Sequence, residues 1–141
     1  MTTTPYLADQ TAPPSSAQVW TGRVLSGIAV LFLLMDATIH VMRIPAAVEG
    51  TIKVGYSAGV LLPLGVIELV FLIVYLIPRT SVLGAILWTG YLGGAVATHV
   101  RVGDPLFSHI LAPTYVAGFL WLGLWLRDPR LRALIPIRRQ S

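Results

Sequence analysis

The chain has 141 residues, of which 55% are hydrophobic and 11% are charged, and its mean hydropathy is +0.77. Soluble domains carry about 25% charged residues, so this composition excludes an ordinary soluble domain and predicts one membrane-embedded unit. The sequence has no cysteine, which excludes disulfides, thiolate metal sites, iron–sulfur clusters and cysteine-based redox relays. The net charge is +4, but five of the ten basic residues lie in the last fifteen positions beside an apolar segment, which favours a membrane anchor over a nucleic-acid partner.

The N-terminal stretch precedes all of the apolar segments. Residues 1–20 are rich in Thr, Pro, Ser and Ala and show no apolar periodicity, so we expect a flexible tail. The stretch has no basic region followed at once by an apolar core and a cleavage site, which argues against a signal peptide.

Four apolar segments follow, at about residues 22–42, 57–77, 81–100 and 106–126. Each is close to the roughly 20 residues that a bilayer-spanning helix needs. Short connections make consecutive helices antiparallel neighbours. We therefore predict an all-α fold, an integral membrane antiparallel four-helix bundle over residues 21–127, with a small interfacial element in the longer link, residues 43–56.

Two of the connections carry residues that favour helix starts. Pro78 ends the second segment, and the hydroxyl groups of Thr80 and Ser81 are suited to cap the third. Asp104 followed by Pro105 predicts an N-cap aspartate with proline at the first helical position.

The distribution of Lys and Arg predicts the orientation. Seven lie on the side of both termini and the second-to-third loop, and three lie on the opposite side. Because cytoplasmic loops are enriched in Lys and Arg, both termini are expected to be cytoplasmic. Residues 128–141 alternate basic and apolar side chains and are expected to form a basic cytoplasmic tail along the inner leaflet.

Each predicted span contributes an ionisable residue to its interior or its end: Asp36, His40, Glu68, His99 and His109. Such residues are costly in lipid and normally face the bundle interior and pair. We therefore expect an outer-facing polar pocket whose candidate catalytic residues are Asp36, His40, Glu68 and His99, with Thr98, Arg101 and His109 as ligand-binding candidates. The alternative is that these groups only hold the helices together, with Arg101 and His109 solvated at the interface.

The histidines and carboxylates are of types that suit zinc or non-haem iron, but their spacing matches no metal motif. Asp36 and His40 stand at i and i+4, without a second such pair and without an HExxH sequence. No haem motif is evident either. The sequence therefore assigns no metal.

Gly90 and Gly94 form a GxxxG motif, which predicts a close helix contact that brings a neighbouring helix close to His99.

Several stretches resemble the DoxX-like family of small bacterial four-helix membrane proteins. They are L-G-V-I-E-L at 64–69, L-I-P-R-T-S-V-L-G-A-I-L at 76–87, T-G-Y-L-G-G-A-V-A-T-H-V-R at 89–101, G-D-P-L-F-S-H-I-L-A-P at 103–113 and W-L-G-L-W-L-R-D at 121–128. The resemblance covers roughly residues 22–134 and implies a location in the bacterial inner membrane. The family is named after a subunit of an archaeal thiosulfate:quinone oxidoreductase, which implies a quinone as ligand and a redox-related role.

Three functions remain open from the sequence. The first is binding of a small lipophilic molecule such as a quinone, with histidines and a carboxylate moving its protons. The second is a membrane-embedded isomerase or hydratase that uses Glu68 as acid and His99 or His40 as base. The third is an assembly or helper subunit that binds a membrane-protein partner or a second copy of itself.

Overall fold

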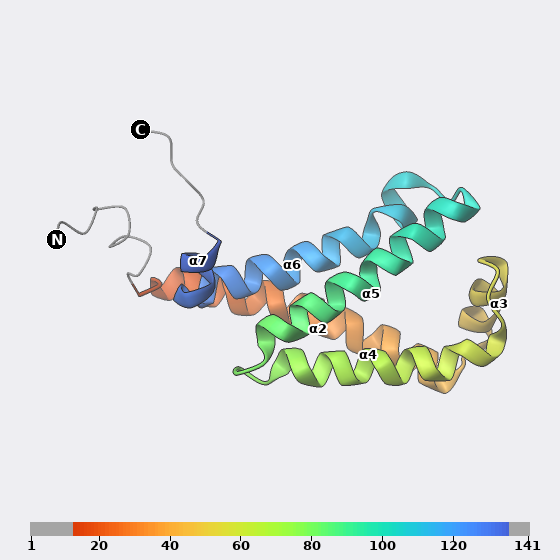
Figure 1. Cartoon of the computed structure of the whole chain (residues 1–141), viewed down its shortest axis with the longest axis horizontal. Coiled ribbons are helices and arrows are strands. Elements are labelled where there is room, and N and C mark those ends of the chain that lie inside the picture. Colours follow the sequence, from red (N-terminus) through yellow and green to blue (C-terminus); the bar gives the residue numbers. More distant parts are fainter. Residues whose placement is uncertain (1–12, 136–141) are drawn as a thin grey trace.

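The computed structural model describes residues 13–135, and every regular element among them is helical (Figure 1). The elements in chain order are α2 (Ser16–Met42), α3 (Pro45–Lys53), η1 (Ala58–Val60), α4 (Leu61–Leu76), α5 (Ser81–Val102), η2 (Leu106–Ile110), α6 (Ala112–Arg127) and α7 (Pro129–Leu134). Four stretches of the described chain are long and apolar enough to cross a membrane, at Ser16–Met42, Ala58–Leu76, Ser81–Val102 and Leu106–Arg127. The predicted all-α four-helix membrane bundle is confirmed.

The first membrane helix begins earlier than the sequence predicted. Ser15 accepts a hydrogen bond from the backbone N–H of Gln18 at 3.2 Å, and the Gln18 side chain accepts one from the Ser15 N–H at 2.8 Å. This reciprocal capping box satisfies two N–H groups that the start of a helix leaves free. The prediction of a flexible tail is therefore wrong for residues 16–20, and residues 1–12 lie outside the described part.

The predicted hydroxyl cap of α5 is also wrong. Thr80 occupies the N-cap position without a side-chain cap hydrogen bond. Its hydroxyl donates instead to the carbonyl oxygens of Val74 at 2.8 Å and Ile77 at 3.4 Å. The Thr80 side chain thus satisfies carbonyl groups at the C-terminal end of α4. The tight turn that follows holds this end of α4 close to the start of α5.

The helices form a closed ring in which α2 packs against α4 and α6, and α5 packs against the same two helices. Consecutive membrane helices run in opposite directions, so α3 and η2 share one end of the bundle and α7 lies at the other (Figure 1). We call these the α3 end and the α7 end.

Close backbone contacts fix two helix pairs at the α7 end. A Cβ atom on Gly123 of α6 would lie 2.3 Å from Ser26 Oγ of α2, and one on Gly84 of α5 would lie 2.4 Å from Tyr75 Cα of α4. Neither position accepts a side chain without movement of the backbone. The α2–α6 and α4–α5 pairs are therefore in contact at this end.

The α2–α4 pair is in contact at the α3 end instead, where a Cβ atom on Gly65 would lie 2.8 Å from Val41. Figure 1 shows that α4 and α5 separate toward the α3 end, and that α2 and α4 separate toward the α7 end. The predicted GxxxG contact is wrong, because nothing lies within 4 Å of a Cβ atom on Gly90 or Gly94.

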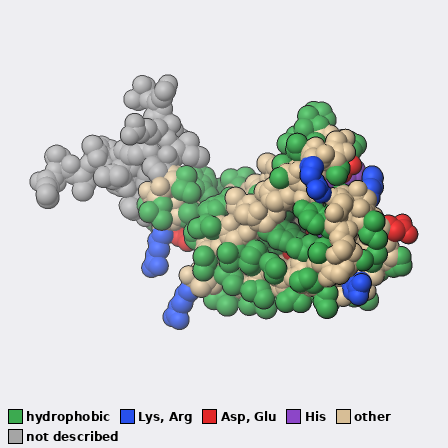
Figure 2. All heavy atoms as spheres, turned by 45° about the vertical axis from the view of Figure 1, so that its right-hand side comes forward, with side chains coloured by type: hydrophobic (Ala, Val, Ile, Leu, Met, Phe, Trp, Pro, Cys, Tyr) green, Lys and Arg blue, Asp and Glu red, His purple; other side chains and the backbone are tan. Residues whose placement is uncertain are grey.

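Aromatic side chains fill the centre of the bundle, and aliphatic side chains cover its flanks. Trp88 is fully buried, and its ring packs edge to face with Tyr91 at 5.5 Å and with Phe71 at 6.1 Å between ring centroids. Figure 2 shows hydrophobic side chains over most of one face and Lys and Arg toward its ends. An exposed apolar flank is the expected surface of a chain that lies in lipid.

Candidate functional site

A cleft of about 680 Å³ opens where α4 and α5 diverge, toward the α3 end of the bundle, and hollows the face shown in Figure 2. Its walls are mostly apolar, and its polar lining consists of Thr51, Tyr56, Tyr91, Thr98, His40 and His99. Gly90 and Gly94 also line it, so that the α5 wall is bare of side chains at these positions. Ligand pockets of about 300–1,000 Å³ with apolar walls and a few convergent polar groups are typical of small-molecule sites.

Glu68 of α4 lies behind the cleft and is 0% exposed. Its Oε1 atom accepts a hydrogen bond from the Tyr91 hydroxyl of α5 and pairs with His40 Nδ1 of α2 at 2.8 Å. Its Oε2 atom is buried and has no hydrogen-bond partner among the described residues. Asp36 lies one helical turn before His40, and we call these four residues, Asp36, His40, Glu68 and Tyr91, the Glu68 cluster.

His40 and Tyr91 connect the buried carboxylate to the cleft, because both line the cleft and both contact Glu68 Oε1. An isolated charge in the membrane interior costs several kcal/mol, whereas a carboxylate with two donors offsets part of that cost. A proton can move along this chain between a molecule in the cleft and Glu68. The sequence predicted one pocket formed by Asp36, His40, Glu68 and His99. The structure brings the first three together, whereas His99 lines the same cleft and pairs with Asp104 instead.

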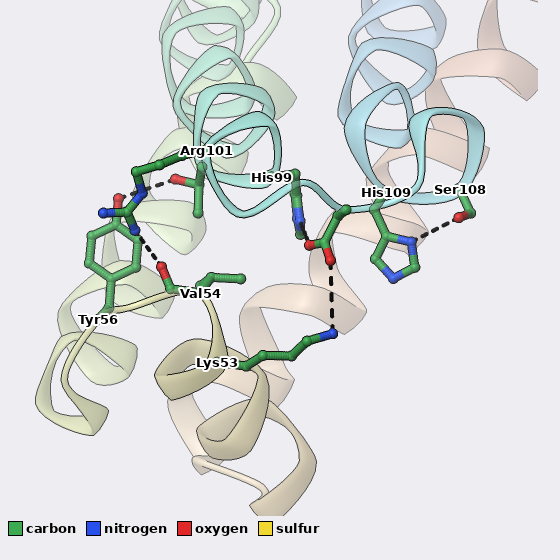
Figure 3. A network of polar contacts seen from close by, with 9 residues as sticks. Lys53, Val54, Tyr56, His99, Arg101, Ser108 and His109 are labelled. Carbon is green, nitrogen blue, oxygen red and sulfur yellow. Dashed lines mark hydrogen bonds and ion pairs between the residues drawn. The ribbon is translucent and has the colours of Figure 1, made fainter.

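A second polar group lies at the α3 end and contributes His99 to the cleft. His99 Nδ1 pairs with Asp104 Oδ2 at 2.7 Å, and Lys53 of α3 lies 3.8 Å from Asp104 Oδ1 (Figure 3). The hydrogen bond from His99, assisted by the charge of Lys53, lowers the pKa of the Asp104 carboxyl below its usual range. The predicted N-cap role of Asp104 is wrong, since Pro105 holds that position and η2 starts without a side-chain cap.

Arg101 does not reach the cleft. It donates a hydrogen bond to the Val54 carbonyl, and its guanidinium lies 5.6 Å from the centre of the Tyr56 ring (Figure 3). The Tyr56 hydroxyl is in turn 3.1 Å from the hydroxyl of Thr98. Arg101 therefore holds the chain after α3 against α5, where Val54 and Tyr56 close the cleft at its polar end.

His109, which the sequence grouped with the site, stands beside the cleft. Its Nδ1 atom is 2.8 Å from the hydroxyl of Ser108, and its ring packs edge to face on His99 with 5.8 Å between centroids (Figure 3). His109 is not part of the cleft wall, so it supports the position of His99.

The comparison with known families bears on all four membrane helices. A model of the DoxX-like family matches residues 24–123, which include every residue of the Glu68 cluster as well as His99 and Asp104. The chain belongs to the DoxX-like family. No curated protein and no solved structure matches it. The resemblance read from the sequence is thereby confirmed, and the DoxX-like chain is a multi-pass membrane protein.

The Glu68 cluster of this DoxX-like protein also contains the donor types of a metal site. Asp36, His40 and Glu68 each offer one ligand atom, and these atoms lie within 4.8 Å of one another. Carboxylate oxygens with an imidazole nitrogen suit several divalent metals. The three residues could hold such an ion.

Sequence reasoning missed Tyr91 and the roles of Asp104 and Lys53. Tyr91 stands between Gly90 and the pair Gly93–Gly94, in a stretch that reads as apolar packing. The only signal for it was a phenol hydroxyl inside a span, a group that needs a hydrogen-bond partner when buried. Asp104 follows His99 by five residues, whereas Lys53 comes from a separate link and only the fold brings it to Asp104.

Proposed function

We propose that this DoxX-like protein binds a quinone or a related lipophilic carbonyl compound in the cleft between α4 and α5, and exchanges protons with it. One observation carries the proposal: His40 and Tyr91 line an apolar cleft, and both are bonded to the buried carboxylate of Glu68. The cleft thus combines space for a flat apolar ring with a proton donor and acceptor behind its wall.

The lining of the cleft suits such a ligand. Leu64, Ile67 and Phe71 of α4 face the bare backbone at Gly90 and Gly94 of α5, which leaves a slot for a ring. The polar groups lie toward the α3 end, where a quinone carbonyl would accept hydrogen bonds from a histidine or a hydroxyl. The apolar tail of the ligand would extend from the cleft into the bilayer.

Reduction of a quinone to a quinol consumes two electrons and two protons. In the proposed reaction, one proton comes from the Glu68 cluster through His40 or Tyr91, and the other comes from His99, which can be reprotonated from the solvent side near Asp104. The electrons come from a separate redox protein in or at the membrane, because the cysteine-free chain supplies no thiol couple.

The charge distribution supports an orientation for this site. The seven Lys and Arg residues on the side of both termini, against three opposite, favour a cytoplasmic position for the termini in a bacterial inner membrane. The cleft would then lie in the outer half of the bilayer, and the polar group of His99, Asp104 and Lys53 would contact the outer aqueous phase.

Ligand-dependent thermal stability of the purified full chain tests the binding. We expect soluble ubiquinone and menaquinone analogues to raise the unfolding temperature saturably, with at least a tenfold weaker apparent Kd in His40→Ala and Tyr91→Phe. Glu49→Gln is the matched control, because Glu49 is an exposed carboxylate on α3 away from the cleft. Unchanged affinity in both cleft variants would refute the proposal.

Proton uptake tests the chemistry separately. After rapid reduction of bound quinone by reduced methyl viologen, which gives up electrons without releasing protons, a pH indicator should report proton uptake that is at least tenfold slower in Glu68→Gln than in the unmodified protein. If this variant binds the quinone and takes up protons at the normal rate, the ligand assignment stands but Glu68 has no role in the reaction.

A second candidate function, acid–base isomerisation of a hydrophobic substrate, is favoured by the buried Glu68 Oε2 atom that has no partner in the described chain. In this reaction Tyr91 would donate its proton to one carbon of a substrate in the cleft and be reprotonated by Glu68, while His40 removes a proton from another carbon, without net change in atoms. Incorporation of deuterium from D₂O into a β,γ-unsaturated ketone, lost in Glu68→Gln, would support this function.

Copurification of a stoichiometric membrane partner from native membranes would support the assembly-subunit role instead.

A further inference from the structure

A second cavity, of about 420 Å³, lies at the α7 end where α2 and α4 diverge. It shares no lining residue with the cleft at the α3 end. Residues of α2 line one side, the end of α4 and the start of α5 line another, and the last turn of α6 closes it. None of the functions discussed above uses this cavity.

Two arginines line it, Arg23 of α2 and Arg127 of α6. Within residues 13–135, neither of them forms an ion pair with a carboxylate. The single acidic residue in the lining, Asp128, accepts a hydrogen bond from the Arg130 N–H at 2.9 Å and thereby caps α7. The lining of the cavity therefore carries a net positive charge.

The floor of the cavity, formed by Ser26 and Tyr75, is a hydrogen-bonded surface. Ser26 Oγ and the Tyr75 hydroxyl are 2.9 Å apart, and Tyr75 donates to the Leu120 carbonyl at 3.1 Å. Arg127 is close enough to Tyr75 to act on it electrostatically. Beside this floor a Cβ atom on Gly27 would meet nothing within 4 Å, so the space next to α2 is open.

We propose that this cavity binds the phosphate group of an anionic phospholipid, with Arg23 and Arg127 as its ligands. Guanidinium groups bind phosphate oxygens through paired, charge-assisted hydrogen bonds. The cavity lies at the level where a membrane helix ends, which is the depth of lipid headgroups, and Val30 and Leu76 in its lining provide an apolar side for an acyl chain. Basic pockets between membrane helices are known sites for anionic headgroups.

The net positive lining favours phosphatidylglycerol or cardiolipin over a zwitterionic lipid, whose ammonium or choline group would add a second positive charge. The basic residues of the same end, including Arg79 and Arg130, attract the anionic lipid to this region without lining the cavity. The bound lipid would fill the gap between α2 and α4 and stabilise the end of the bundle at which these helices are apart.

Native mass spectrometry of the full chain, released from detergent supplemented with lipids, tests the proposal. We expect phosphatidylglycerol and cardiolipin adducts to survive and phosphatidylcholine adducts to be lost, with anionic adducts at least tenfold weaker in the double variant Arg23→Gln, Arg127→Gln. The matched control is Arg79→Gln, which removes an exposed charge from the same end but not from the cavity. Equal losses in the control and the double variant would overturn the proposal.

A variant that keeps both charges tests the cavity itself. Gly27→Leu places a side chain in the open space beside α2, where the helix tolerates it, and should displace the lipid without unfolding the protein. Retention of the lipid in Gly27→Leu would show binding at the surface and would overturn the assignment to the cavity. Stabilisation of the delipidated chain by inorganic phosphate alone, to the same extent as by phosphatidylglycerol, would identify free phosphate, not a lipid, as the ligand and would likewise overturn it.

Discussion

Two histidines line one cleft, and each has its Nδ1 atom paired with a carboxylate, yet the pairs lie in different surroundings. Glu68, the partner of His40, is fully buried between helices, whereas Asp104, the partner of His99, lies in the loop before η2 next to the exposed Lys53. A buried carboxylate that loses its partners cannot turn to water, but one at the end of the bundle can. The His40–Glu68 pair is therefore needed for the stability of the fold, whereas the carboxylate of the His99–Asp104 pair can be replaced at little cost.

The largest expected effect is that of Glu68→Ala. Removal of this carboxylate takes the shared acceptor from His40 and Tyr91 and leaves a hole, so we expect a loss of about 3–5 kcal/mol in the free energy of unfolding. Asp104→Ala, the matched change in the other pair, should lower the unfolding temperature in detergent far less. Similar losses for the two variants would contradict the distinction between the pairs.

Tyr91→Phe removes one donor from Glu68 Oε1 and keeps the aromatic packing on Trp88. We expect a loss of about 1–3 kcal/mol in the free energy of unfolding, the usual cost of taking a donor from a buried acceptor. Tyr56→Phe is the control, because its hydroxyl contacts Thr98 in an exposed position. Thermal unfolding of the two variants under identical conditions should place Tyr91→Phe clearly lower.

The glycines of α5 also differ in their surroundings, because Gly84 is packed against α4 and Gly94 faces the open cleft. Gly84→Ala should cost about 1–3 kcal/mol through overpacking, because its Cβ atom would lie 2.4 Å from Tyr75 Cα. Gly94→Ala should leave stability equal or higher, since a Cβ atom there meets nothing within 4 Å. Gly94→Leu, which narrows the cleft, should weaken binding of a quinone analogue, and stronger binding in that variant would argue against a ligand in this slot.

The smallest expected effect is a dependence of stability on acid. The folded-state pKa of Asp104 lies below its ordinary value of 3.8, so this residue contributes stability above pH 3.8 that is lost as the pH falls through the folded pKa. Unfolding temperatures between pH 6 and about pH 3 should therefore fall slightly less in Asp104→Asn than in the unmodified chain. Glu49→Gln, on the exposed face of α3, should show the full decrease.

The sequence was sufficient for the membrane spans and for part of the site. Runs of about 20 apolar residues have one stable form in lipid, the helix, so hydropathy alone located the four helices. Ionisable groups in lipid normally pair, which led to the prediction that Asp36, His40, Glu68 and His99 form one group. The first three do lie together, and His99 pairs with Asp104 instead. The spacing of Asp36 and His40 on one helical face added to that inference.

The sequence failed where the outcome depended on which helix faces meet. Gly90 and Gly94 have the spacing of a packing motif but lie in an open cleft, and the close contacts are made by Gly65, Gly84 and Gly123. A small residue permits the close approach of another helix but does not determine which helix packs there, or whether one does. Arg101 likewise contacts a carbonyl and an aromatic ring at the α3 end and does not line the cleft.

By itself, then, the sequence determined a DoxX-like membrane protein with four apolar helices and costly polar groups that must find partners inside it. These properties depend on local composition and on the absence of water in lipid, which act on each segment alone. Only the tertiary structure decided that Tyr91 joins Glu68, that Lys53 lies beside Asp104, and that helices touching at alternate ends open one cleft at each end of the bundle. Those features depend on helix rotation and crossing, which follow from contacts between residues far apart in the chain.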